Sequence, residues 1–338
     1  MRRSKTLARA SILRHPSGTS IPTPLLVPSF SSKGFGSDAD NRSEIGDIFK
    51  VASEILTETM LVSAYDIHQR FLSVPERSIT DLTFLDSGGY EIAPHQDLSA
   101  IFHQPSSSGE WRKEMLISVL DKWPAHVPAV FVNYDHPRLR KPLDRQISDA
   151  RSLLSHYPHH LHEILVKPEN KRQLHVQVNN VIGRATELGS FNVIGLTEKE
   201  IGGHPLDRMK AIAEIRMALD DAGVSSPIHI FGSLDPITSV LYFLAGAEIF
   251  DGLTWLRFGY LEGHAIYIQN FGALKVGIER RQDRVKADVI AGNYHYLMDL
   301  QKQMRTFVVD QDFSRFRYHR QFFKDSFDLL RTKNRRLS

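Results

Sequence analysis

The amino-acid sequence predicts an α/β fold, namely a (β/α)8 TIM barrel with a C-terminal helical appendage. Eight short apolar runs bounded by turn residues alternate with amphipathic helical patterns, which is typical of parallel β/α units. These units occupy roughly 250 residues, the usual size of an eightfold barrel. A doubly wound parallel sheet has the same alternation, so periodicity alone leaves that second architecture open.

The predicted strands are the short apolar runs at residues 25–28, 60–64, 82–85, 129–133, 163–167, 192–196, 228–231 and 247–251. The predicted helices are the amphipathic segments at residues 44–56, 113–122, 143–156, 171–188, 206–222 and 236–245. Gly189, Gly223 and Gly246 follow the last three helices, because glycine readily adopts the left-handed conformation that ends a helix.

Three parts follow from this order. Residues 1–22 form a basic N-terminal segment, residues 23–291 the barrel, and residues 292–338 a helical appendage packed on the barrel's outside. Within the appendage, two amphipathic helices are expected at 293–308 and 312–330. Residues 95–109, which include the serine tract 106–108, are predicted to form a mobile loop.

The composition limits the class of protein. The chain contains no cysteine, which excludes disulfides and thiolate metal sites and gives no reason to expect an oxidising compartment. No run reaches the eighteen or so apolar residues that a membrane span needs, so no membrane association is expected. The basic first residues lack the apolar core of a secretory signal; a short basic strand is the simpler interpretation, and a transit peptide the alternative. We therefore expect a cytoplasmic protein.

Basic residues concentrate late in the sequence, although the net charge is only +3. Arg257, Lys275, Arg280 and Arg281 all follow Asp251. A cationic cluster near an active site suggests a polyanionic partner, whose binding would weaken with salt. A solvated helix face is the alternative interpretation of such a run.

Two acidic residues mark candidate catalytic positions. Asp86 ends the apolar run 82–85 and is followed by Ser87, Gly88 and Gly89, while Asp251 ends the run 247–250. Barrel enzymes keep their chemistry at the carboxyl ends of the strands, and glycines there allow the backbone to approach a flat ligand closely. An ordinary Asp/Gly turn would also account for the first segment alone.

Eight segments, in this order along the chain, resemble the tRNA-guanine transglycosylases, barrel enzymes that exchange a guanine base in tRNA for a 7-deazaguanine. The segments are TPLLVP at 23–28, LVSAYDI at 61–67, LDSGGY at 85–90, YDHP at 134–137, IGL at 194–196, IFGSLDP at 230–236, IFDGLTWLR at 249–257 and the stretch 292–316. They cover most of the chain and fall on successive predicted strand ends.

The resemblance implies two catalytic carboxylates. Asp251 would be the nucleophile that holds the sugar C1′ as an ester while one base leaves and another enters. Asp86 would move the proton of the departing and incoming base. Two acids with separate tasks need different environments, so we expect a raised pKa for Asp86 and an ionised Asp251.

The resemblance also implies a base-binding site. Asp135 would accept hydrogen bonds from the guanine edge, although an Asp after a strand is also a common cap. Tyr90 and Phe231 would stack on opposite faces of the base; without the resemblance each would be assigned to the core. The remaining base-binding candidates are Gly88, Gly89, Gly195, Leu196 and Lys167. The candidates for nucleic-acid backbone contacts are Arg257, Lys275, Arg280 and Arg281.

The chain departs from the family pattern at several positions. The family carries a structural zinc bound by three cysteines and a histidine, and a chain without cysteine cannot form that site. No cofactor is therefore expected. Ser63 stands where the family has Asn, Glu91 where it has Gln, and Lys167 where it has a Gln that contacts the base. Lys167 would pair with Asp135 or Glu169, or meet an anionic group on the substrate.

Three functions remain open from the sequence. The first is base exchange in a nucleic acid, with tRNA preferred over DNA as the partner and a purine or 7-deazapurine base as the second substrate. The second is a non-catalytic subunit that binds tRNA or a partner enzyme; the presence of both Asp86 and Asp251 argues against it. The third is an unrelated barrel enzyme on a phosphorylated substrate, which the missing Gly-rich phosphate loop disfavours. A homodimer is compatible with all three.

Overall fold

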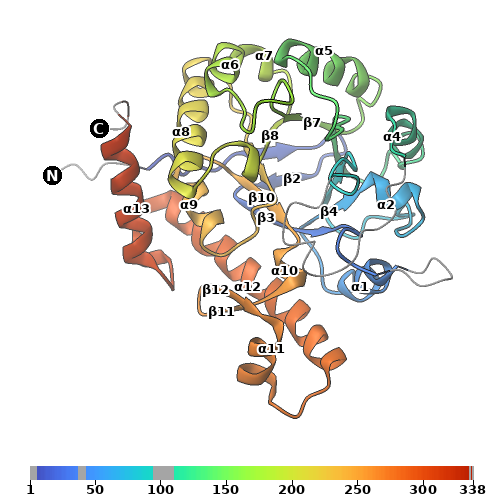
Figure 1. The fold of residues 1–338 in the computed structure, drawn as a ribbon, viewed down its shortest axis with the longest axis vertical. Coiled ribbons are helices and arrows are strands. Elements are labelled where there is room, and N and C mark those ends of the chain that lie inside the picture. Colours follow the sequence, from blue (N-terminus) through green and yellow to red (C-terminus); the bar gives the residue numbers. More distant parts are fainter. Residues whose placement is uncertain (1–5, 37–42, 94–109, 335, 337–338) are drawn as a thin grey trace.

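A closed barrel of eight parallel strands forms the centre of the computed structural model, which describes residues 6–36, 43–93, 110–334 and 336 (Figure 1). Each strand pairs with the next along the chain, and β10 (Ile249–Gly252) pairs back with β3 (Leu25–Phe30). This closing pair confirms the predicted barrel and excludes the doubly wound sheet, whose outer strands would have free edges.

All eight predicted strands are present, within two residues of the predicted bounds at each end. Between β3 and β10 come β4 (Thr59–Ser63), β5 (Leu82–Asp86), β6 (Ala129–Val132), β7 (Leu161–Val166), β8 (Val193–Thr197) and β9 (Ile228–Phe231). Alternate side chains fill the barrel: Leu25 and Val27 belong to the inner apolar cluster, whereas Leu26 packs outward in the large cluster beneath the helices.

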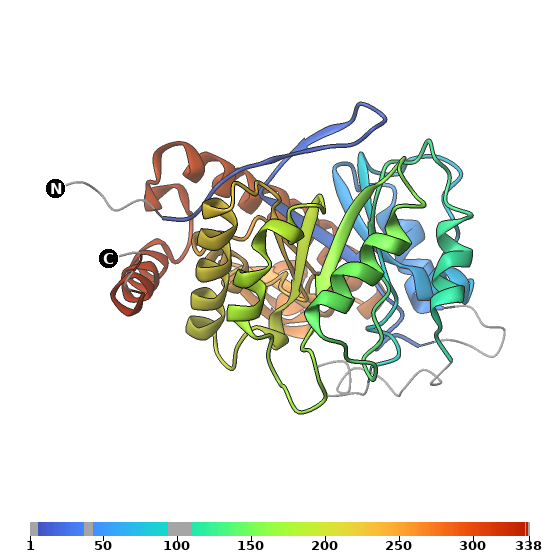
Figure 2. The ribbon, with the colours of Figure 1, turned by 90° about the horizontal axis from the view of Figure 1, so that it is seen from above.

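An N-terminal hairpin closes the amino-terminal end of the barrel. Strands β1 (Ile12–Arg14) and β2 (Ser20–Pro22) pair antiparallel, and Leu13 and Ile21 are buried in the same inner cluster as the barrel strands. Figure 2 shows the hairpin, in dark blue, across this end of the molecule. Residues 12–22 therefore contribute directly to the barrel core.

Helices cover the outside of the barrel. They are α1 (Glu44–Ala52), α2 (Ala64–His68), α4 (Lys113–Leu120), α5 (Leu143–Leu154), α6 (Val178–Gly183), α7 (Ala185–Leu188), α8 (Pro205–Asp221) and α9 (Thr238–Leu244). The helix predicted at 171–188 is wrong in its first part. Asn170 accepts a hydrogen bond from the Arg172 amide through its side chain, and the Val176 amide donates to Glu200, so these residues bond outside a helix.

The C-terminal helices differ from the prediction in their bounds. Helix α12 (Gln282–Asp310) is 29 residues long and begins eleven residues before the predicted helix, so the predicted boundary at residue 292 falls inside it. The predicted helix 312–330 is a 3₁₀ turn (Phe313–Arg315) followed by α13 (Arg320–Lys333). His319, with φ 58°, separates the two, because a left-handed residue cannot continue a helix.

A lobe that the sequence did not predict projects from the barrel after β10. It contains the hairpin β11 (Phe258–Leu261) and β12 (His264–Tyr267), the helix α11 (Ile268–Phe271), a π-helical turn (Gly272–Val276) and the first half of α12 (Figure 1). We call it the β11–β12 lobe. Phe271, Val285 and Val289 form its small apolar core.

The predicted loop at 95–109 lies outside the described residues. Among the described helices, none combines the length and the apolar character needed to cross a membrane.

Candidate active site

The two predicted catalytic acids lie at the same end of the barrel. Asp86 is the last residue of β5, and Asp251 lies near the end of β10. Parallel strands of a barrel end at one mouth, and the charge of Asp251 acts on Asp86 strongly enough to contribute to its raised pKa. The structure therefore brings together two carboxylates that are 165 positions apart in the sequence.

Asp251 is held by three hydrogen-bond donors. Ser29 Oγ donates to Oδ2 at 2.7 Å, the Gly232 amide donates to Oδ1 at 3.2 Å, and His229 Nε2 lies 3.2 Å from Oδ1. The residue is 5% exposed. Donors that converge on a buried carboxylate stabilise its negative charge.

His229 connects Asp251 to a second buried acid. Its Nδ1 atom lies 2.8 Å from Oε1 of Glu163, and both side chains are completely buried. Burial alone would lower the pKa of His229, but the charge of Glu163 and the hydrogen bonds to Asp251 and Glu163 outweigh burial and raise it to about 9. The imidazole is therefore a cation between two carboxylates at neutral pH.

Asp86 has the opposite environment to Asp251. Its described hydrogen bond is from the Gly88 amide to Oδ2, at 3.2 Å. Burial, with the charge of Glu91 next in importance, raises the pKa of Asp86 to about 8. The Asp86 carboxyl is therefore largely protonated at pH 7 and can serve as a proton donor. Its raised pKa agrees with the expected division of roles between the two acids.

Glu91 and Asp66 are two further buried acids close to Asp86. Ser31 Oγ donates to Glu91 at 2.6 Å, and Ser32 donates to Asp66 through both its amide and its hydroxyl. Burial raises the pKa of Asp66 well above its ordinary value and also raises that of Glu91. Of these two acids, Glu91 contributes to the raised pKa of Asp86, because a nearby negative charge favours the protonated form.

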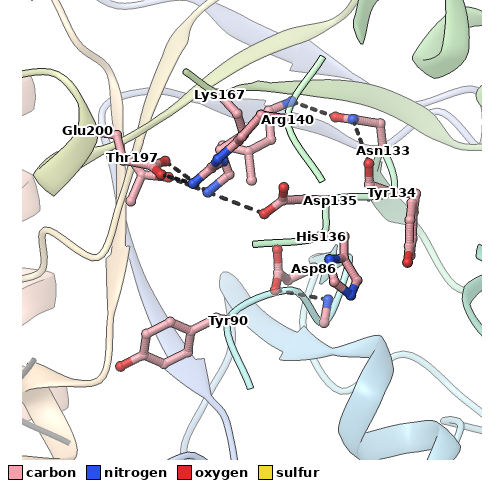
Figure 3. A network of polar contacts seen from close by, with 12 residues as sticks. Asp86, Tyr90, Asn133, Tyr134, Asp135, His136, Arg140, Lys167, Thr197 and Glu200 are labelled. Carbon is pink, nitrogen blue, oxygen red and sulfur yellow. Dashed lines mark hydrogen bonds and ion pairs between the residues drawn. The ribbon is translucent and has the colours of Figure 1, made fainter. Parts of the chain in front are cut away.

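Asp135 and Lys167 form an ion pair at the carboxyl ends of β6 and β7. Lys167 Nζ lies 3.2 Å from Asp135 Oδ2, 3.0 Å from Glu200 Oε2 and 2.9 Å from Thr197 Oγ1 (Figure 3). Of the two acids expected to pair with Lys167, the structure selects Asp135. Glu169 instead accepts a hydrogen bond from the Leu143 amide. Asp135 and Lys167 both line a cleft that extends over α5.

Phe231 lies directly beside the charged centre of the barrel. Its ring stacks on His229 with centroids 4.0 Å apart and planes at 27°. Gly195, on β8, leaves room for both partners: a Cβ atom there would lie 2.7 Å from Glu163 Oε1 and 2.7 Å from Phe231 Cε2. Gly195 therefore packs closely against Phe231 and Glu163, and its expected contact with the incoming base stays a prediction.

Tyr90 and the glycines after Asp86 lie on the β5 side of the mouth. Lys33 Nζ lies 4.4 Å from the centroid of the Tyr90 ring. A Cβ at Gly89 would lie 2.8 Å from Asp135 Oδ2, and Gly88 has φ 83°, a conformation that favours glycine. The stacking of a base between Tyr90 and Phe231 stays a prediction.

The four basic candidates for nucleic-acid contacts divide into two groups. Arg257 is buried and donates to the Lys33 carbonyl at 2.7 Å, which leaves it little surface for the expected phosphate contact. Lys275 is exposed in the π-helical turn, and Arg280 and Arg281 are exposed between that turn and α12. These three residues contribute to the charged surface of the β11–β12 lobe, whereas the buried Arg257 binds the loop after β3.

Several site residues were missed by sequence reasoning, namely Ser29, Glu163, His229, Thr197 and Glu200. Glu163 and His229 stand inside apolar strands, LHEILV and IHIF, where a polar residue in the barrel interior is unusual. That pattern was an available signal for a buried polar network.

Within the described part of the chain, no group of three or more His, Asp or Glu side chains is arranged to hold a metal ion. The fold and the site together define a (β/α)8 barrel protein with a cluster of acids, among them Asp86, Asp251 and Glu163, and the histidine His229 at its mouth and interior. A scan against models of protein families gives no match, and a search of curated proteins finds none that matches this sequence.

Proposed function

We propose that this protein is a transglycosylase that exchanges a guanine base in a nucleic acid for a 7-deazaguanine or a related base through a covalent aspartyl-ribosyl intermediate. One observation carries the proposal. Asp251, surrounded by three donors, and Asp86, whose pKa is raised to about 8, meet at one barrel mouth. A negatively charged nucleophile beside a protonated acid is what the exchange of an N-glycosidic bond requires.

In the first half of the reaction, a carboxylate oxygen of Asp251 attacks C1′ of the sugar. The bond from C1′ to the base nitrogen breaks, its electron pair stays on the base, and Asp86 donates a proton to the departing base. The products are a neutral free base, an ester between Asp251 and C1′, and an ionised Asp86.

The second half of the reaction runs in the opposite direction with a different base. Ionised Asp86 takes the proton from the incoming base, the base nitrogen attacks C1′, and the bond to Asp251 breaks. The ester keeps the sugar attached to the protein between the two steps, so the protein never releases a nucleic acid that lacks a base at this sugar. Exclusion of water during this interval is favoured by the burial of both acids, which are 8% and 5% exposed.

Base recognition is assigned to groups around the same mouth. Asp135 would accept hydrogen bonds from the guanine edge, and Phe231 and Tyr90 would cover its faces. Gly195 and Leu196, on β8, would offer backbone groups to a substituent of the incoming base. The closeness of Gly195 to Phe231 and of Gly89 to Asp135 supports this assignment, because both glycines make room beside the proposed base-binding side chains.

The nucleic acid would contact the exposed cations of the β11–β12 lobe, Lys275, Arg280 and Arg281. The lobe follows the proposed nucleophile along the chain and is held by an apolar core around Phe271. Transfer RNA is the first substrate to test and duplex DNA the second.

The test is incorporation of radiolabelled guanine by the purified protein, with unmodified tRNA and duplex DNA offered in parallel at low salt. Label in one polymer, together with its loss in Asp251→Ala, supports the proposal and identifies the polymer. Asp235→Asn is the matched control, because Asp235 follows β9 and caps residues 237 and 238 outside the proposed chemistry. No label in either polymer contradicts base exchange, and retained tRNA binding would then favour a non-catalytic binding subunit.

A further inference from the structure

We propose that Glu163 and His229 act with Asp251 as a buried acid–imidazolium–acid relay that positions the nucleophile and directs its Oδ2 atom to the sugar. In this relay His229 and Glu163 are positioning residues, which act through Asp251 and do not touch the substrate. The inference rests on the proposed function only in naming Asp251 as the nucleophile. The relay itself is a property of the barrel interior.

An acid oxygen faces each nitrogen of His229, so the imidazolium matches the geometry with both acids ionised. Nδ1 faces Glu163 Oε1 at 2.8 Å, and Nε2 faces Asp251 Oδ1 at 3.2 Å. A neutral imidazole would direct a lone pair at one of these oxygens. Asp251 already accepts from Ser29 and Gly232, so it acts as an acceptor on both oxygens. Only the imidazolium donates to both acids at once.

Glu163 gives the relay its charge balance. A His229 cation paired with Asp251 alone would form a neutral pair and reduce the negative charge available for attack on C1′. Glu163 is completely buried, and its second oxygen, Oε2, has no hydrogen-bond partner among the described residues. Burial raises the pKa of Glu163, and the charge and hydrogen bond of His229 act in the opposite direction. With both acids ionised and His229 protonated, the three groups together carry one net negative charge. That charge is available at Asp251.

His229 is enclosed by strand neighbours and by two aromatic rings. Its register neighbour on β8 is Gly195, and its neighbour on β10 is Ile249. Phe231 stacks on one face of the ring at 4.0 Å, and Phe84 from β5 meets it edge-on with centroids 5.4 Å apart. The charged groups that act on it are Glu163 from β7 and Asp251 from β10. The ring is thus fixed by packing and charged by two named partners.

The relay also distinguishes the two oxygens of Asp251. Oδ1 accepts from the Gly232 amide and from His229, whereas Oδ2 accepts from Ser29 in the described structure. The oxygen with fewer donors keeps more electron density and has a free lone-pair direction. Oδ2 is therefore the oxygen that forms the ester, while Oδ1 anchors the carboxylate to the barrel.

The first experiment measures the charge of His229 without reference to any activity. Protein labelled with ¹⁵N-histidine is titrated by NMR, with His160 as an internal reference, because burial lowers the pKa of that histidine to about 4. We expect the His229 nitrogens to report imidazolium at pH 7 and to titrate near pH 9. Glu163→Gln should lower that midpoint by at least about one unit. A neutral His229 at pH 7 overturns the relay.

The second experiment measures the rate of formation of the covalent adduct between protein and nucleic acid. Glu163→Gln, which keeps the side-chain shape, should slow this rate roughly tenfold, and His229→Gln roughly 100-fold, with the KM for guanine unchanged in both. His160→Gln is the matched control, a buried barrel histidine that stacks on Phe131 away from the mouth. It should leave the rate unaltered.

The two experiments separate the possible failures. Absence of an adduct in the wild-type protein overturns the proposed function and, with it, the positioning role, whatever the NMR titration gives. An adduct in the wild type that forms equally fast in a folded Glu163→Gln variant overturns the relay alone. If His229→Gln does not fold, Glu163→Gln and the wild-type titration still decide the question.

Discussion

Lys167 Nζ lies 3.2 Å from Oδ2 of Asp135, so the acid expected to bind the guanine edge is already paired with a lysine. The ion pair is largely buried, with side-chain exposures of 17% and 10%. The ammonium also binds Glu200 and Thr197, and it therefore separates two acids that would otherwise repel each other. An incoming base has to share Asp135 with Lys167 or displace it.

Lys167→Gln should destabilise the fold by about 3 kcal/mol, because removal of one partner from a buried ion pair leaves the other charge uncompensated. Asp135 would then lack its cation, while Glu200 would keep its ion pair with Arg140 at 2.6 Å. Urea denaturation measures the change in the free energy of unfolding. Lys141→Gln is the control: its pair with Asp149 is exposed, with side-chain exposures of 49% and 37%, and should contribute less than about 1 kcal/mol. Equal effects of the two substitutions would contradict the buried pairing.

Asp135→Ala should raise the KM for guanine by roughly tenfold or more, because two hydrogen bonds to the base edge are lost and each good bidentate contact contributes about 1–3 kcal/mol. Its kcat should change less, since Asp135 does not take part in bond breaking. The measurement is the exchange of radiolabelled guanine over a range of concentrations. Asp149→Ala, in the same cleft, should leave the KM as it is. An unchanged KM in Asp135→Ala would remove this residue from base recognition.

The rate of adduct formation should fall above about pH 8, because the pKa of Asp86 is raised to about 8 by burial and by Glu91. Below that pH the carboxyl holds the proton that the departing base needs; above it the carboxyl is ionised and cannot donate.

Asp86→Asn should slow adduct formation by roughly 10²–10⁴-fold, the usual contribution of a general acid. In Asp86→Asn the decline of this rate near pH 8 should disappear. A second decline near pH 9, caused by deprotonation of His229, should remain. Rates measured from pH 6 to 10 on both proteins test this, and a fall near pH 8 that persists in Asp86→Asn would exclude Asp86 as its origin.

The barrel was predictable because each strand is a buried apolar run, and burial from both sides makes such runs continuous in the sequence. The β11–β12 lobe was not, because no residue of its second strand is fully buried and its small core joins Phe271 of α11 to Val285 and Val289 of α12. The start of α12 was missed because it opens in a charged stretch, in which Lys286 pairs with Glu44 of α1.

The candidate site was predictable to the extent that it depends on strand ends. Asp86 and Asp251 each follow an apolar run, so their meeting at one mouth follows from the barrel. Glu163 and His229 also belong to strands, but nothing in either segment indicates that their side chains meet over Gly195 of the intervening strand β8. That contact depends on the order and register of three strands, which a single segment does not encode.

Gly195→Ala should weaken both the relay and the base-binding side of the mouth. The added Cβ would lie 2.7 Å from Glu163 Oε1 and from Phe231 Cε2, too close for either contact, so Glu163 or the Phe231 ring must shift. We expect a loss of about 1–3 kcal/mol in the free energy of unfolding, the usual range for overpacking a barrel core. The NMR midpoint of His229 should also move, because Glu163 Oε1 is its partner.

The control for this substitution is Gly183→Ala. Gly183 lies at the end of α6, and a Cβ there meets no atom within 4 Å. Alanine loses less chain entropy than glycine on folding, so this variant should be neutral or more stable by up to about 1 kcal/mol. Thermal unfolding of both variants, together with the histidine titration, gives the comparison. A Gly195→Ala protein with wild-type stability and an unmoved His229 midpoint would show that the barrel accommodates the methyl group, and that Gly195 is not needed to keep Glu163 and Phe231 in place.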